Sequence, residues 1–476
     1  MSEHKEVLKM KDNKEKPLSV STGMDMTNGP MLGKILAFAL PLAGGSVLQQ
    51  LFNAVDVAVV GRFASSSALA GVGANSSVVS LFVTLFVGIS VGANVVIANN
   101  IGRNSLDRIS DAVHTSVLFG LLSGFGLMFL GLAVARPLLE LLGTPEDVMD
   151  LAVLYLRIYM FGMPFIMLYN FGSAVLRSMG DTRRPLYSLI VAGVVNAVLN
   201  VIFVVGFHRS VDGVAAATVI SNVLSAGMII WFLLHEEEPV RLHPSRLKMH
   251  RDILGKTLRI GVPAGLQGMV FSISNVVIQS GINRYGAAAI AGVSVALNCD
   301  IFAYFTVSGF AQAAVTFTAQ NFGAGKLDRC RNVFHITMAC GIVVSLLYTA
   351  VLIPLRYQLV GIFTEDPAVM DFATRRIVII MLPYVLVNTY EITGSCLRGL
   401  NHSMTPALLT IIGTCVLRIF WVRIVDPLVN DFAVLMYVYP VSWILTGAMV
   451  LAAYFIIRGR VEKEFQEWDV NDPAAA

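Results

Sequence analysis

Long apolar blocks, separated by short charged breaks, constrain the fold of this chain more than any other feature of its sequence. A helix needs about 20 apolar residues to cross the roughly 30 Å hydrocarbon core of a bilayer, and every block is at least that long. Charged residues make up only 14% of the 476 residues, and mean hydropathy is +0.72, whereas soluble domains carry about 25% charge. The pattern predicts twelve transmembrane helices, near residues 35–61, 70–98, 109–136, 148–179, 185–207, 213–234, 252–281, 287–319, 330–354, 370–397, 405–426 and 432–457. We therefore expect an all-α polytopic membrane protein.

The two halves of the chain repeat in one register. Matching segments lie 221 residues apart, or 222 near the start of each half. The pairs are NIGRNSLDR at Asn100 with NFGAGKLDR at Asn321, VMDLA at Val148 with VMDFA at Val369, LRSMG at Leu176 with LRGLN at Leu397, and Pro41 with Pro263. Six spans per copy is an even number, so both copies enter the membrane from the same side. This predicts two pseudo-symmetric six-helix bundles, a parallel repeat whose axis runs along the membrane normal.

The division that follows has two lobes, a linker and two tails. We expect a disordered cytoplasmic tail at 1–30, an N-lobe at 31–234, a cytoplasmic linker at 235–250, a C-lobe at 251–457 and a cytoplasmic tail at 458–476. With both termini inside, the inner segments hold most of the 34 lysines and arginines, as the positive-inside rule requires. We expect a monomer in a bacterial plasma (inner) membrane, in contact with lipid and without a nucleic-acid partner.

One carboxylate lies within the first apolar block. Asp56 is the single charge in residues 35–60, and an ionised Asp at mid-membrane costs at least about 2.5–3.5 kcal/mol. Such a residue is kept if it is neutral, paired, or facing a wet cavity. Because a proton or a cation could switch it between these states, we interpret Asp56 as an ion-coupling group. The alternative is an aspartate that is only hydrogen-bonded to its neighbours.

The doubled six-helix plan resembles the multidrug and toxic compound extrusion (MATE) family. The segments that carry this resemblance are PLAGGSVLQQLFNAVDVAVVGRF from Pro41, LRSMGDTRRP from Leu176, and NAVLN from Asn196 followed by GVAAAT, and it extends over about 30–457. It implies a secondary active antiporter that exports cationic or amphipathic compounds in exchange for H⁺ or Na⁺. It also implies alternating access, with two lobes rocking around a central cavity.

In such transporters the acid of the N-lobe follows a helix-bending proline by fifteen residues, as Asp56 follows Pro41 here. Asn196, Asn200 and Thr218 resemble the polar network around that acid, although some members have a second aspartate at the position of Asn200. Their oxygens could hold Na⁺ or relay a proton. The alternative is a set of ordinary interhelical hydrogen bonds.

In the C-lobe, Asp300, Glu391 and Arg418 lie in apolar sequence. Two acids and one arginine could form a cluster with one negative charge left to meet a cationic drug or a second ion. The alternative is a static arginine–acid pair that holds helices together. Glu391 is the repeat partner of Asn170, so the two copies differ at this position.

Soft and aromatic side chains should line the cavity, because aromatic faces attract cations and methionine adapts its shape. The predicted lining residues are Tyr169, Tyr304, Phe310, Tyr384 and Tyr390. The phosphate-loop pattern GxxxxGK[ST] is absent from the sequence, so we expect an ion gradient as the energy source and no cofactor. The five cysteines form no CxxC pair, and we expect neither disulfides nor a metal site other than Na⁺.

Three other function classes are less consistent with the sequence. A flippase of lipid-linked or amphipathic substrates has a similar helix plan, but it would need several arginines at mid-span. An enzyme would need a clustered nucleophile, histidine pair or metal set, and the eight histidines are scattered. A channel would need a repeated filter sequence, which the chain does not contain.

Overall fold

The computed structural model describes residues 23–63, 66–141 and 143–471, and these segments are helical apart from short connections. The helices of the first half are α2 (Met31–Phe63), α3 (Ser66–Gly102), α4 (Leu106–Leu141), α5 (Glu146–Met160), α6 (Met163–Ser178), α7 (Arg183–Val201) with its continuation η1 (Ile202–Gly206), and α8 (Val211–Leu234). The long helices of the second half are α9 (Arg251–Ile282), α10 (Ala287–Gly323), α11 (Leu327–Leu352), α13 (Pro367–Met381), α14 (Val387–Gly399) and α19 (Val438–Asn471). Shorter elements complete it: η2 (Pro244–Arg246), η3 (Asn283–Tyr285), α12 (Arg356–Gly361), η4 (Tyr384–Leu386), α15 (Met404–Thr410), η5 (Ile411–Val416), α16 (Leu417–Phe420), η6 (Trp421–Val425), α17 (Asp426–Val429) and α18 (Phe432–Met436).

Within the described residues, ten helices are long and apolar enough to cross a membrane, and the number is twelve if each of two bent pairs forms one span. The bent pairs are α5 with α6, at 45°, and α13 with α14, at 48°. They are repeat equivalents, and the breaks fall at Phe161–Gly162 and at Pro383, where glycine and proline interrupt a helix. The predicted class of all-α polytopic membrane protein is confirmed. The sequence did not predict the two bends.

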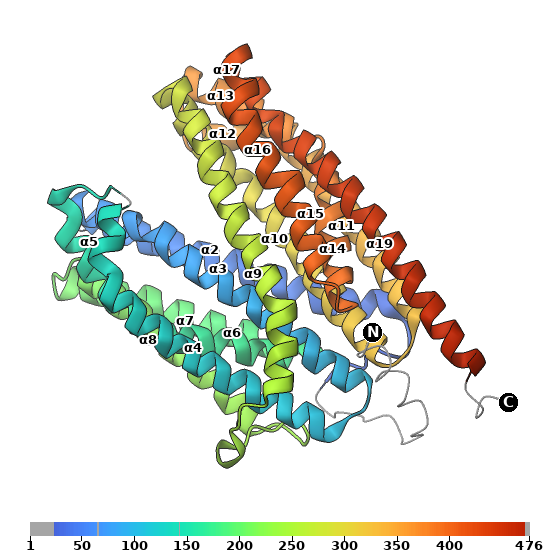
Figure 1. The fold of residues 1–476 in the computed structure, drawn as a ribbon. Coiled ribbons are helices and arrows are strands. Elements are labelled where there is room, and N and C mark those ends of the chain that lie inside the picture. Colours follow the sequence, from blue (N-terminus) through green and yellow to red (C-terminus); the bar gives the residue numbers. More distant parts are fainter. Residues whose placement is uncertain (1–22, 64–65, 142, 472–476) are drawn as a thin grey trace.

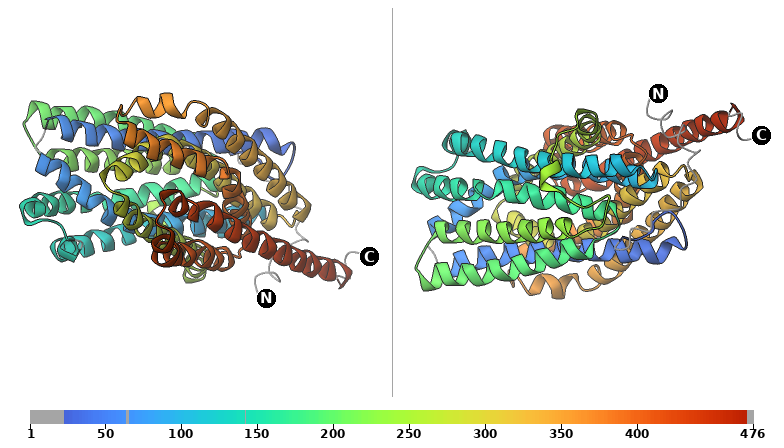
Figure 2. Two further views of the ribbon diagram at one scale, coloured as in Figure 1. Left: turned by 90° about the horizontal axis from the view of Figure 1, so that it is seen from above. Right: turned by 90° about the horizontal axis from the view of Figure 1, so that it is seen from below.

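The helices form two bundles that meet at one end of the molecule and diverge at the other (Figure 1). Helices α2 to α8 make up one bundle and α9 to α19 the other, which we call the N-lobe and the C-lobe. The N-terminal end of α2 and the C-terminal end of α19 lie at the end where the lobes meet, which we call the closed end (Figure 1). The last turns of α19 project beyond the other helices at this end (Figure 2).

Glycine-rich helix crossings join the lobes. A Cβ on Gly88 of α3 would lie 2.3 Å from the backbone of Gly265 in α9, and one on Gly309 of α10 would lie 2.7 Å from the carbonyl oxygen of Ala39 in α2. Gly88 and Gly309 are repeat partners, so each lobe contributes the same glycine to one of two pseudo-symmetric crossings. Since even a methyl group does not fit, the two backbones pack directly on each other.

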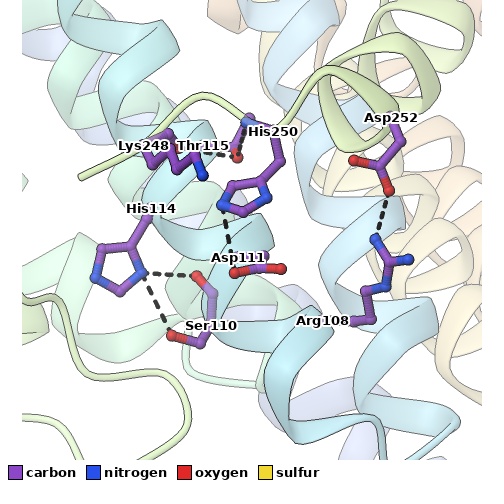
Figure 3. Close-up of polar contacts among 8 residues, drawn as sticks. All are labelled: Arg108, Ser110, Asp111, His114, Thr115, Lys248, His250 and Asp252. Carbon is purple, nitrogen blue, oxygen red and sulfur yellow. Dashed lines mark hydrogen bonds and ion pairs between the residues drawn. The ribbon is translucent and has the colours of Figure 1, made fainter. Parts of the chain in front are cut away.

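The linker lies against the N-lobe. Its Val240 and Leu242 are buried, the backbone N–H of His243 donates to Nε2 of His114 (3.0 Å), and that of His250 donates to Oγ1 of Thr115 (3.2 Å). Figure 3 shows these helix α4 side chains facing the linker, with the Arg108–Asp252 ion pair beside them. The predicted linker is therefore an ordered part of the N-lobe surface.

Part of each predicted tail is ordered in the structure. Residues 23–30 were predicted to be disordered, but Met26 is fully buried and its carbonyl oxygen accepts a hydrogen bond from Asn321 (3.1 Å). The backbone N–H of Met24 also donates to the carbonyl oxygen of Met179 in the N-lobe (2.9 Å). Residues 1–22 lie outside the described part of the chain. At the other terminus, α19 continues without a break through the predicted boundary at 457 to Asn471.

Candidate functional site: the N-lobe polar network and the cleft between the lobes

The structure brings Asp56, Asn196, Asn200 and Thr218 together from three helices. Asn200 Nδ2 donates to Asp56 Oδ1 and to Asn196 Oδ1 (3.1 Å), and Asn196 Nδ2 is 3.5 Å from Thr218 Oγ1. Asn196 and Asn200 share one face of α7 because they are four residues apart. The predicted grouping of these four residues is therefore present in the structure.

This network leaves one oxygen unused. Asn200 Oδ1 is buried and has no hydrogen-bond partner among the described residues, although a buried amide oxygen normally has one. It belongs to the same side chain that donates to Asp56. A carboxylate beside a free amide oxygen offers the hard oxygen ligands that Na⁺ prefers, and the carboxylate alone can accept a proton.

The charged residues of the C-lobe do not form the predicted cluster. Asp300 of α10 pairs with Arg376 of α13 at 2.6 Å, and both side chains are buried. Arg418 instead donates to Asn275 Oδ1 (3.0 Å) and lies against the rings of Phe271 and Tyr439. The prediction that groups Asp300 with Arg418 is therefore wrong, because Arg376 of α13 is the arginine that lies beside Asp300.

Glu391 has a different electrostatic neighbour. It attracts Arg398, which lies two turns further along α14. Arg398 also donates to Gln267 Oε1 (2.8 Å) and Ser395 Oγ (3.1 Å). The three predicted residues thus lie in three separate settings: a buried ion pair, an arginine between two rings, and an acid near an arginine that was not among the predicted site residues.

A cleft runs between the lobes, and the α3–α10 crossing divides it into two pockets. Val87, Val91, Ser308 and Gln312 border both pockets. The N-lobe pocket has a volume of about 350 Å³ and the C-lobe pocket about 340 Å³. Each is large enough for part of a drug-sized molecule.

Three of the five predicted aromatic residues line the cleft. Tyr169 borders the N-lobe pocket, and Tyr304 and Tyr390 border the C-lobe pocket. Phe310 and Tyr384 are buried in the core of the C-lobe instead, where Tyr384 packs edge-on against Trp443. The prediction that these two line the cavity is wrong. Phe310 lies on α10 and Tyr384 in η4, and both side chains pack against neighbouring helices.

Pro41 lies inside α2 and also borders the N-lobe pocket. A helix-interior proline removes one backbone hydrogen bond, so this wall of the pocket contains the weakest point of α2. The phenol of Tyr159 borders the same pocket and interacts electrostatically with Asp56. The charge of Asp56 therefore acts on a residue that borders the cleft.

Two arginines of the cleft were not predicted as site residues. Arg177 borders the N-lobe pocket and Arg398 borders the C-lobe pocket, and they are repeat partners in the segments LRSMG and LRGLN. The repeat was visible in the sequence, but it did not show which of its residues border the cleft. The amide side chains of Gln49, Asn222 and Gln312 also line the N-lobe pocket, and no sequence pattern distinguished them from other polar residues.

Comparisons with known proteins agree with this architecture. The family model MatE matches residues 41–202 and 263–422, one match in each lobe. The chain is 27% identical to "Probable multidrug resistance protein YoeA" of Bacillus subtilis over 79% of this chain and 82% of that protein. It is 23% identical to "Multidrug export protein MepA" of Staphylococcus aureus, over 72% and 76% of the two chains.

Solved structures show the same fold. A chain described as an "Outward-facing conformation of a multidrug resistance MATE family transporter of the MOP superfamily" superposes with a TM-score of 0.87 and 21% identity, covering 94% of this chain and all of that one. A MOP superfamily transporter from Pyrococcus furiosus, described by a "reverse polarity of binding pocket", gives a TM-score of 0.86 at 20% identity, covering 94% of this chain and 100% of that one. The family model covers more than half of the chain. The chain therefore belongs to the MATE family of multidrug efflux transporters, and it is a multi-pass membrane protein rather than an enzyme.

Proposed function

We propose that the chain is a secondary active antiporter that exports amphipathic compounds, including cationic ones, in exchange for H⁺ or Na⁺. The observation that carries the proposal is the N-lobe network, in which Asp56 accepts a hydrogen bond from Asn200 while Asn200 Oδ1 has no partner among the described residues. A membrane carboxylate beside an unused oxygen is a site that a proton or a cation can enter and leave. The relatives' printed names, which describe multidrug resistance and export, support the direction of transport.

Binding of an ion at Asp56 would be linked to the shape of α2. Protonation converts the Asp56 carboxylate from an acceptor into a group that can also donate, so the contact with Asn200 must change. Asp56 and Pro41 share α2, and a proline-containing helix bends at little cost. A change at Asp56 would then alter the wall of the N-lobe pocket, which Pro41 borders.

Alternating access would separate the two glycine crossings when the closed end opens. The closed end carries the start of α2 and the end of α19, and by the positive-inside rule it would face the cytoplasm, so that the lobes diverge towards the outside. We therefore propose that both termini lie in the cytoplasm, at a bacterial plasma membrane. We further propose that a single chain is the working unit, because each lobe supplies one half of the cleft.

Dye transport into everted membrane vesicles tests the proposal. An imposed pH gradient and then a sodium gradient should each be applied to vesicles that contain the wild type or Asp56→Asn, with ethidium as the dye. One charge that crosses 100 mV supplies about 2.3 kcal/mol, enough for a concentration ratio of about fifty. One gradient should drive ethidium uptake in the wild type, and Asp56→Asn should abolish it with normal membrane insertion.

The control for this experiment is Asp150→Asn, because the Asp150 side chain is 92% exposed and lies outside the network. It should transport like the wild type. Undiminished gradient-driven uptake by Asp56→Asn would exclude Asp56 from the coupling mechanism.

A flippase of lipid-linked or amphipathic substrates is the second candidate function. The observation in its favour is that Arg177 and Arg398 both border the cleft, since the sequence argument against a flippase was a shortage of arginines there. A flippase would move a fluorescent phospholipid between the leaflets of reconstituted vesicles. The antiporter would leave that lipid in place and transport ethidium.

A further inference from the structure

The N-lobe pocket contains a positive charge without a counter-ion. Arg177 is the one charged side chain among the described residues that line it. Its Nε is buried. Within the described residues this Nε has no hydrogen-bond partner, and no carboxylate lies within ion-pair distance of the guanidinium. The ionisable group that interacts with it electrostatically is the Tyr169 phenol, whose hydroxyl already donates to the carbonyl oxygen of Pro185 (3.3 Å).

The repeat shows that this lack of a counter-ion is specific to the N-lobe. In the C-lobe pocket, the equivalent Arg398 is near Glu391 and donates to Gln267 and Ser395. The residue of the N-lobe that corresponds to Glu391 is Asn170, which also lines its pocket. The same fold therefore carries a compensated arginine in one pocket and an uncompensated one in the other.

A purely structural role for Arg177 does not account for its surroundings. Arg177 lies in the last turn of α6, where an arginine commonly satisfies the free carbonyl groups of the helix end. Its buried Nε has no acceptor among the described residues, and the same is true of Arg398, so what distinguishes Arg177 is that no carboxylate of the described residues lies beside its guanidinium. An arginine held in a pocket with an unsatisfied donor is costly unless something supplies the missing acceptor and charge.

The remaining lining complements a molecule with one anionic group. Amide and hydroxyl side chains line the same pocket: Gln49, Asn170, Asn222, Ser225 and Gln312. Ile166, Leu186 and Leu189 form an apolar wall in the same pocket. Guanidinium groups bind carboxylate and phosphate through two parallel hydrogen bonds, and the apolar wall would accommodate a hydrophobic body.

We propose that the N-lobe pocket binds the anionic head group, a carboxylate or a phosphate ester, of an amphipathic substrate, with Arg177 as its counter-ion. This proposal rests on the transport function above and deepens it by adding a charge class to the cationic one expected from the sequence. The C-lobe pocket, where Glu391 and Arg398 compensate each other, has no such preference for an anion.

A pair of dyes that differ by one ester tests the proposal. Rhodamine 110 carries a free carboxylate, and its methyl ester does not. Their binding to the purified full-length protein in nanodiscs can be followed by fluorescence anisotropy without any ion gradient. The wild type should bind the carboxylate dye about 10- to 100-fold more tightly than the ester, the range expected for charge-assisted hydrogen bonds. Arg177→Gln should abolish this preference without weakening binding of the ester, and Arg177→Lys should retain part of it.

A control variant locates the effect. Arg375→Gln, at a C-lobe position whose side chain is 57% exposed, should leave the preference intact. Equal affinity of the wild type for the two dyes would overturn the proposal. It would also be overturned if Arg177→Gln lost affinity for both dyes to the same extent and Arg177→Lys bound neither dye. If the carboxylate dye binds but no gradient drives its transport, the antiporter function fails while the anion site stands.

Competition identifies the source of the anion. Lysophosphatidic acid and lysophosphatidylcholine share an acyl chain and differ in whether the phosphate has a cationic partner. Displacement of rhodamine 110 by lysophosphatidic acid alone assigns the site to lipid phosphates as well as to soluble carboxylates. If neither lipid displaces the dye, the site serves soluble anions. Displacement by both lipids to the same extent would show that the acyl chain rather than the charge is recognised, which contradicts the proposal.

Discussion

A methyl group added to the α3–α9 crossing should open the closed end of the transporter. A Cβ on Gly265 would lie 2.3 Å from the carbonyl oxygen of Leu85 and 2.9 Å from Leu85 Cδ1. Ordinary contact begins near 3.4 Å, so Gly265→Ala forces the two backbones apart by about 1 Å. Overpacking of this kind costs about 1–3 kcal/mol. Because the crossing exists only while the lobes meet at this end, the cost falls on the closed state alone.

Gly255→Ala is a matched control. Gly255 lies on the same helix, α9, and a Cβ there would meet nothing within 4 Å. Both substitutions gain the same helix propensity, up to about 1 kcal/mol, so the difference between them isolates the clash. We expect Gly265→Ala to lower the ratio of closed to open molecules by about 5- to 150-fold relative to Gly255→Ala.

Electron–electron double resonance between spin labels measures this ratio. Arg183 and Met404 are repeat partners at the first turns of α7 and α15, both exposed, and are suitable labelling positions after the five native cysteines are replaced. Gly265→Ala should add a longer distance to the distribution, and Gly255→Ala should not. Identical distributions in the two variants would refute the view that the backbone contact at Gly265 holds this end closed.

The C-lobe ion pair and the N-terminal segment give two further predictions. Arg376→Met leaves Asp300 buried without its partner and should destabilise the protein by about 3–5 kcal/mol. Arg375→Met, at an exposed pair, should change stability by less than about 0.5 kcal/mol. Thermal unfolding in detergent measures both variants, and equal losses of stability would contradict the prediction for Arg376→Met. Arg329→Gln removes hydrogen bonds to the carbonyl oxygens of Met26 and Gly29 and should shift the same spin-label distances towards the open state, unlike Arg331→Gln at a neighbouring exposed position. A distribution unchanged in Arg329→Gln would show that residues 23–30 do not hold the lobes together.

The sequence predicted those features that depend on local pattern. Hydrophobic length located the spans, and the four-residue spacing of Asn196 and Asn200 placed both on the face that meets Asp56. The cost of a carboxylate in an apolar block marked Asp56 correctly as a residue that needs partners, although its role in coupling stays a prediction. Each of these predictions depends only on the geometry of a single helix or on the free energy of transferring one side chain into the membrane.

Features that depend on how helices turn relative to one another could not be predicted. Arg375 and Arg376 are neighbours in the sequence, yet the register of α13 exposes Arg375 and buries Arg376. Tyr384 and Phe310 are aromatic like the lining residues, but their side chains are packed in the core of the C-lobe. Arg177 was missed for a different reason: the repeat was recognised, but which of its residues border a cleft depends on where the two lobes separate.

The docked linker has a consequence for any attempt to divide this protein into two co-expressed polypeptides. Val240 and Leu242 cover apolar surface of the first bundle, and Glu236 is bound by Arg184. Residues 235–250 are therefore a packed part of that bundle and not a flexible connection between the two. A cut before His235 would expose the apolar surface of the first polypeptide that residues 235–250 bury, and it would leave this apolar segment unpacked at the start of the second. A cut directly after His250 would keep residues 235–250 on the polypeptide whose apolar surface they bury.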